Sequence, residues 1–90
     1  MSAAYNSALH TAQRACHRRR LASIERAHDE GVALAPIVVS FAPAVYLWDG
    51  HHRLFVARRR GLAEIRAVDV RGGAPFMLAL EALAHVKAYW

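Results

Sequence analysis

The chain has 90 residues, the size of one small domain with a single modest core. Twelve Lys and Arg residues against seven Asp and Glu give a net charge of +5, which favours a polyanionic or acidic partner and argues against a cationic one. Cys16 is the single cysteine, so an intramolecular disulfide is excluded, and no run of about 18 apolar residues is present to span a membrane.

Residues 2–30 are predicted to be helical, because helix-forming residues dominate and the first glycine is Gly31, a natural stop. The apolar stripe is interrupted near residues 17–20, so two shorter helices are an alternative. The β-branched run after Pro36 predicts a strand over 37–41. A second strand is expected over 45–48, and the two together indicate a hairpin.

The second half continues with a predicted helix over 51–60, which Gly61 ends, and a strand over 65–70. After the Gly72-Gly73 loop, Pro75 suits the first turn of a last helix over 75–88. The element order is therefore α-β-β-α-β-α. We expect an α+β domain spanning 1–90, with a small mixed β-sheet and packed helices.

The segment Asp49-Gly50-His51-His52-Arg53 lies between the second predicted strand and the helix that follows it. The first N–H groups of a helix have no acceptor within the helix and lie at the positive end of its dipole, so they attract anions. An arginine in the first turn strengthens such a site, and Asp49 is in position to cap the helix. The segment therefore predicts a phosphate-binding turn.

Chemistry at this turn would depend on few groups. His51 and His52 are candidate general acid–base residues, since an unperturbed histidine titrates close to neutral pH, and Asp49 is the nearby carboxylate. The sequence names no second catalytic partner, so the catalytic residues and the question of enzymatic activity stay open. The six histidines show no metal-ligand spacing, and no metal site is predicted.

Two blocks of the chain resemble the N-terminal domain of ParB-type proteins. The first is Leu21-Ala22-Ser23-Ile24-Glu25, followed by Gly31 and by Pro36-Ile37-Val38-Val39. The second is Asp49-Gly50-His51-His52-Arg53-Leu54, followed by Ala57, Gly61 and Ile65. Both occur in the family's order, over residues 18–71. The resemblance implies the fold that ParB-like proteins share with sulfiredoxins.

The resemblance also implies a ligand. Members of this superfamily bind CTP or ATP, with Mg²⁺, at the turn before the helix, and some act as nucleases or ATPases. By position, Gly50 would allow close backbone approach, and His51, His52 and Arg53 would belong to the phosphate site. Asp49 would cap the helix or help to hold a metal.

The chain departs from the family in three places. His51 stands where sulfiredoxin-like members carry a cysteine, so reduction of a sulfinic acid is not expected. Residues 1–17 do not match the strand and arginine block that open ParB proteins. No helix-turn-helix module follows before Trp90, so centromere reading and CTP-gated clamping are not expected.

Two further features suggest partners. The basic triplets are candidate nucleic-acid contacts with a solvated helix face as the alternative; they are Arg18, Arg19, Arg20, Arg58, Arg59 and Arg60. The predicted last helix carries an apolar face that could be core or a protein-binding surface; its residues are Phe76, Met77, Leu80, Leu83 and Ala84, with Tyr89-Trp90 beyond them.

The sequence therefore supports three functions. The first is a cytoplasmic domain that binds the phosphate of a nucleotide or nucleic acid. The second is a small phage- or plasmid-type inhibitor that blocks a nucleic-acid enzyme through its basic surface or its last helix. The third is a metal-dependent nuclease or NTPase. No membrane partner is expected in any of them, and a homodimer is a further expected assembly because a chain this short has a small core.

Overall fold

A single helix, α1 (Ala3–Glu30), occupies the first third of the chain in the computed structural model. The structure describes residues 3–86, and side chains from Ala15 onward. The helix does not break near residues 17–20, because no glycine or proline interrupts 28 residues of good helix formers. It ends at Gly31, whose φ of +68° suits the left-handed position after a helix.

Four short strands form one mixed sheet in the order β2-β1-β3-β4. They are β1 (Ile37–Ser40), β2 (Tyr46–Asp49), β3 (Glu64–Asp69) and β4 (Phe76–Ala79). The pairs β1–β2 and β3–β4 are antiparallel, whereas β1 and β3 are parallel. The predicted hairpin of the first two strands is confirmed, as is the α+β class with a small mixed sheet.

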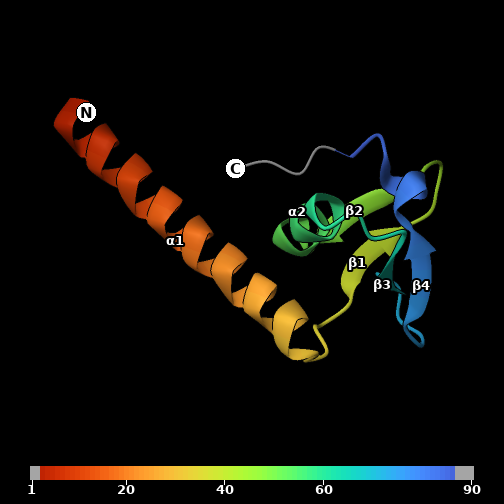
Figure 1. Ribbon diagram of the computed structural model, residues 1–90. Coiled ribbons are helices and arrows are strands. Elements are labelled where there is room, and N and C mark those ends of the chain that lie inside the picture. The colour runs from red at the N-terminus through yellow and green to blue at the C-terminus, as the bar shows by residue number, and fades with distance from the viewer. Residues whose placement is uncertain (1–2, 87–90) are drawn as a thin grey trace.

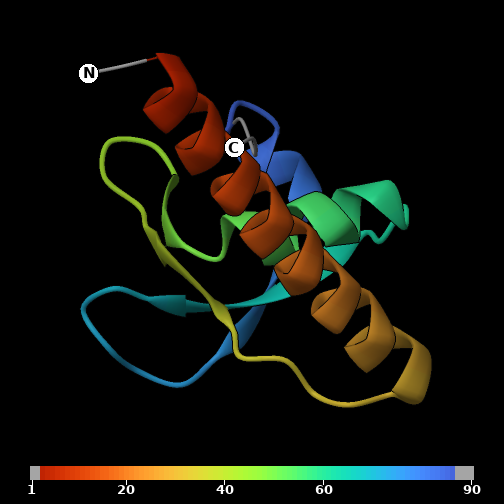
Figure 2. The ribbon, with the colours of Figure 1, turned by 90° about the vertical axis from the view of Figure 1, so that its left-hand side faces the viewer.

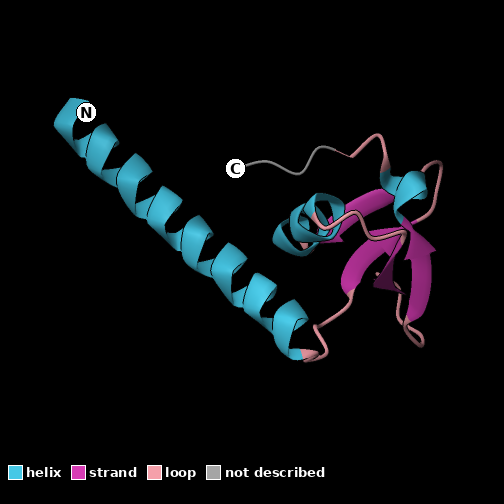
Figure 3. Ribbon diagram, viewed as in Figure 1, coloured by secondary structure: helices cyan, strands magenta, loops and turns pink. Residues whose placement is uncertain are grey.

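The helix α2 (His51–Arg59) connects β2 to β3 and covers one face of the sheet, and α1 lies outside α2 (Figure 1). Figure 2, viewed from the side of α1, shows α1 crossing in front of α2 and the sheet. Both helices therefore lie on the same side of the sheet, as the colours of Figure 3 make plain.

The core lies between the sheet and α2. Its fully buried apolar side chains come from β1, α2, β3 and the segment Leu80–Leu83, and they are Ile37, Val39, Leu54, Ala67 and Leu83. Leu47 of β2 and Phe76 and Leu78 of β4 are partly buried against this core, and inward residues alternate along each strand, as the pleat of a β-sheet requires. The small size of this cluster agrees with the expectation from chain length.

The predicted helix over 75–88 is wrong. Residues Phe76–Ala79 form β4 and Leu80–Leu83 form a short 3-10 helix, η1. Gly72 and Gly73 adopt φ values of +109° and +110° between β3 and β4, so they join these strands as a hairpin. Pairing of β4 with β3 outweighs the high intrinsic helix propensity of Met, Leu and Ala.

The apolar face predicted for this last helix is therefore also wrong. Phe76 and Leu78 point to the core and Leu83 is fully buried, whereas Met77 lies on the opposite face of the sheet. The inhibitor hypothesis therefore has no α-helix over 76–83 with which to dock. Residues 87–90, including Tyr89-Trp90, lie outside the described residues.

Ion pairs connect α1 to the end of α2. Arg59 Nη2 lies 2.7 Å from Glu25 Oε2, and Arg60 bonds both Glu25 and Asp29, the latter at 2.7 Å. The Arg60 and Arg59 guanidinium groups lower the pKa of Glu25 below its ordinary value of 4.5. Arg59 and Arg60 thus have intramolecular partners that sequence reasoning did not foresee.

Acid is expected to weaken this connection. Because the folded-state pKa of Glu25 lies below the unfolded value, its stabilising contribution is present above pH 4.5 and is lost as the pH falls through the folded pKa. Thermal midpoints measured between neutral pH and pH 3 should fall less steeply for Glu25→Gln than for the parent chain. Glu30 lies on the same helix, and its carboxylate has no ion pair among the described side chains. The Glu30→Gln variant should therefore lose stability with falling pH as steeply as the parent chain. Equal slopes for all three chains would contradict this role.

Candidate functional site

A cavity of about 370 Å³ lies at the N-terminus of α2, where the chain passes from β2 into the helix. Three α1 residues line one side, Arg20, Ser23 and Ile24. The other side is the predicted phosphate turn in full, Asp49, Gly50, His51, His52 and Arg53. The fold therefore brings the two sequence blocks together, although more than twenty residues separate them in the chain.

Gly50 is required by packing against the sheet. It is buried, has φ +107°, and starts the helix by accepting a hydrogen bond of 2.9 Å from the Leu54 N–H. A Cβ at this position would lie 2.5 Å from Ile37 Cγ2 and 3.2 Å from Ile37 Cα. Gly50 therefore allows the start of α2 to approach β1 closely.

Arg53 is the most strongly bonded side chain of the turn. Its Nη1 donates to the carbonyl oxygens of Ala35 at 2.7 Å and Pro36 at 3.1 Å, and its Nη2 lies 3.3 Å from Asp49 Oδ2. Only 18% of the side chain is exposed. Three of its five N–H donors are thus engaged with the protein, which holds the chain before β1 against α2 and leaves two donors for a ligand.

Asp49 does not cap α2. The N-cap is Gly50, which has no side chain to bond the helix, and the Asp49 carboxylate pairs with Arg53 one turn later. The prediction of an Asp49 cap is wrong because β2 continues through Asp49 and the left-handed Gly50 intervenes. The N–H groups of the first turn of α2 are therefore not satisfied by a side-chain cap.

His52 lies in a positively charged surrounding. Its ring centroid is 5.0 Å from that of His17 on α1. Burial lowers the pKa of His52 below its ordinary value of 6.5, and the nearby His17, Arg20, His51 and Arg53 lower it further. The neutral imidazole is thus favoured, and an anion entering the cavity would relieve the repulsion that produces part of this shift.

Arg20 is the lining residue that sequence reasoning assigned elsewhere. The sequence predicts Arg18, Arg19 and Arg20 together as nucleic-acid contacts or as a solvated helix face, yet Arg20 alone of the three lines the cavity. It has no ion pair among the described side chains 15–86, so its guanidinium is available. Ser23, in the first sequence block, was a signal that this turn of α1 faces the site.

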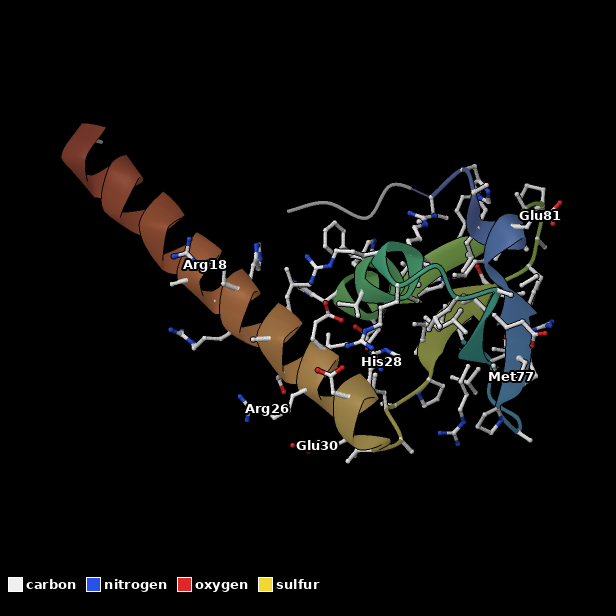
Figure 4. All side chains as sticks on the ribbon, in the orientation of Figure 1. Arg18, Arg26, His28, Glu30, Met77 and Glu81 are labelled. Atoms are coloured by element: carbon white, nitrogen blue, oxygen red, sulfur yellow. The ribbon has the colours of Figure 1, made fainter. Side chains whose placement is uncertain are left out.

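The two basic triplets thus differ in the structure. Arg18 and Arg19 are exposed, and Arg18 points away from the sheet and α2 (Figure 4). In the second triplet, Arg58 donates to the Leu83 carbonyl oxygen, and Arg59 lies 5.2 Å from the centre of the Phe55 ring besides pairing with Glu25. The second triplet serves the packing of α2 between α1 and η1.

The described residues contain neither a cluster of metal ligands nor a membrane-spanning helix. No group of three or more His, Cys, Asp or Glu side chains is placed to hold a metal ion among the described residues. Within the same part of the chain, neither helix is long and apolar enough to cross a bilayer. In the cavity, Asp49 is the one carboxylate of the lining, and it is paired with Arg53.

Comparisons with known proteins leave the family unassigned. No protein-family model matches the chain, and neither a curated protein nor a solved structure matches it.

Proposed function

We propose that the cavity at the start of α2 binds the phosphate of a nucleotide or nucleic acid. The observation that carries the proposal is the convergence of Arg20 from α1 with the uncapped N-terminus of α2 in one cavity. The N–H groups of residues 51–53 would cradle the phosphate oxygens, and Arg20 would supply the main positive charge. His51 and His52 line the same space.

The sequence position of Arg53, in the first turn of α2, indicates a contact with phosphate, whereas in this proposal Arg53 mainly positions the turn. Its bonds to Ala35, Pro36 and Asp49 make it the residue that positions the turn, with two donors left for the ligand. Substitution of Arg53 would therefore disturb both folding and binding. Arg20 is the better residue on which to test binding.

The resemblance to ParB and sulfiredoxin-like domains supports the same ligand class from a separate direction. It covers both sides of the cavity, since Ser23-Ile24 belongs to one block and Asp49-Gly50-His51-His52-Arg53 to the other. CTP or ATP, with Mg²⁺ accompanying the phosphates, is the ligand that the resemblance favours. A cytoplasmic location belongs to this proposal.

The residues that line the cavity favour binding over turnover, because they offer few oxygen ligands for a metal ion. Mg²⁺ is usually held by one or two carboxylates together with substrate phosphates, and Asp49 is already paired with Arg53. Asp49 would have to leave this pair to hold a metal. A nuclease or NTPase therefore stays the second hypothesis, and Mg²⁺-dependent turnover of NTP or DNA would establish it.

Affinity should increase as the pH falls. A bound phosphate removes the repulsion from His17, Arg20, His51 and Arg53, so the pKa of His52 rises on binding. The gain is complete below the pKa of the free protein, which lies under 6.5, and is lost as the pH rises through the pKa of the complex. Titrations with a phosphodiester oligonucleotide from pH 8 to pH 5.5 should show this slope in the parent chain. His52→Gln should flatten the slope, and an unchanged slope would exclude His52 from the site.

The direct test is calorimetric titration with CTP, ATP and a short single-stranded DNA, each with and without Mg²⁺. We expect one of these ligands to bind with a dissociation constant of about 1–100 μM, a usual range for a small exposed phosphate site. Absence of binding in all six titrations would refute the proposed function.

A further inference from the structure

Among residues 3–86, no helix covers the face of the sheet opposite α2 (Figures 1 and 3). Its side chains are those that alternate with the core residues, and the exposed apolar ones lie on the two edge strands. Trp48 is 63% exposed, Met77 58% and Tyr46 50%. Val38 and Val68, on the central strands, are half-buried between them. We call these five residues the open face.

The pairing of β1 and β2 turns Trp48 outward. Val38 lies opposite Asp49 and Val39 opposite Leu47, so Trp48 is an extra residue in β2 at a β-bulge. Leu47 packs against the core while Trp48 is exposed. The bulge thus presents the largest side chain of the sheet on the surface without helix cover.

Charges on and beside the open face balance one another. Glu64 and Arg66 lie two residues apart on β3, on the same side as Val68. Asp49 pairs with Arg53 and Asp69 with Arg71. Arg18 and Arg26 of α1 have no ion pair among the described side chains, lie on the far side of the molecule and point away from the sheet (Figure 4). A polyanion is therefore a poor match for this face.

We infer that the open face is the interface with a second copy of this chain. A two-fold axis sets Glu64 and Arg66 of one copy against Arg66 and Glu64 of the other, so a neutral face with one acid and one base is complementary to itself. It also allows two molecules of net charge +5 to associate through a neutral surface. Sheets packed face to face in this way form a shared apolar layer.

The exposed area is sufficient for a specific but weak dimer. At 63% and 50% exposure, Trp48 and Tyr46 leave roughly 100–150 Å² each to bury. With the other open-face residues from both copies, the buried area reaches on the order of 1,000 Å², the lower bound for a specific interface. We therefore expect a dissociation constant on the order of 10 μM.

Sedimentation equilibrium of the full chain, at concentrations below and above this dissociation constant, tests the inference. The parent chain should dimerise, and Trp48→Lys should weaken the dimer at least about 30-fold, as loss of a large aromatic side chain from an interface does. Met77→Lys is a second variant on the opposite edge strand and should weaken it as well. Ala22→Lys is the matched control, because Ala22 is an exposed small apolar residue of α1, four residues from both Arg18 and Arg26, which point away from the sheet. All three positions are exposed, and circular dichroism will confirm that each variant is folded.

A parent chain that stays monomeric at millimolar concentration would overturn the inference. So would dimerisation that Ala22→Lys abolishes and the two open-face substitutions leave intact. Titration with labelled oligo-dT separates a nucleic-acid platform from a protein interface: oligonucleotide binding by a monomeric parent chain that Trp48→Lys abolishes would also overturn it. None of these outcomes depends on the phosphate cavity on the other side of the sheet.

Discussion

Replacing Gly50 by alanine is expected to lower the free energy of unfolding by about 2–5 kcal/mol, in two parts. An L-residue held at φ +107° is strained, which costs about 1–2 kcal/mol. The added methyl group must also displace Ile37, a fully buried residue of β1, whose Cγ2 would lie 2.5 Å away. Overpacking of that kind costs about 1–3 kcal/mol. Urea denaturation of both chains measures the difference.

Gly61→Ala is the matched control. Gly61 ends α2 with φ +69°, but a Cβ there would meet nothing within 4 Å. Alanine at this position would be strained by the positive φ but would not press on a neighbour. We therefore expect the free energy of unfolding to fall by about 1–2 kcal/mol. Equal losses at the two positions would show that the approach of Gly50 to Ile37 has no energetic consequence.

Replacing Arg20 by glutamine is expected to weaken phosphate binding about 10- to 100-fold, the effect of removing one charge-assisted hydrogen-bond donor. Arg20 lines the cavity and has no ion pair among the described side chains, so the substitution should leave thermal stability close to that of the parent chain. Calorimetric titration with whichever of CTP, ATP or DNA binds the parent chain measures the loss.

Arg19→Gln is the control for net charge. Arg19 is exposed on the same helix, one residue away, and does not line the cavity. Removing it changes the overall charge equally, so its effect should stay below about threefold and diminish with added salt. Equal losses for the two variants would mean that α1 attracts the ligand only through its overall charge.

The sequence predicts most of the framework because the signals there are local. Gly31 and Gly61 end helices at left-handed positions, and the β-branched run after Pro36 forms a strand. The prediction of a helix over 75–88 is wrong because the structure of this segment depends on a contact distant in the sequence. Residues 76–79 are too few for a clear period of two, and their preference is decided by pairing with β3, which is a tertiary contact.

The site was predicted in part. The turn from Asp49 to Arg53 was visible because it is contiguous in the chain, whereas Arg20 comes from a distant helix whose packing on α2 the sequence does not reveal. The bonds that Arg53 makes within the protein could not be predicted for the same reason. Its partners are the carbonyl oxygens of Ala35 and Pro36, and backbone groups give no signal in a residue pattern.

The most direct test of the phosphate site is a titration of ¹⁵N-labelled protein, followed by NMR, with a nucleotide or oligonucleotide. Binding at the start of α2 predicts the largest shifts at the amides of His51, His52 and Arg53 and at the side-chain Nε of Arg20. The amides of Arg18 and Arg19 should shift less. Shifts confined to the exposed arginines of α1, with the amides of residues 51–53 unchanged, would contradict the account.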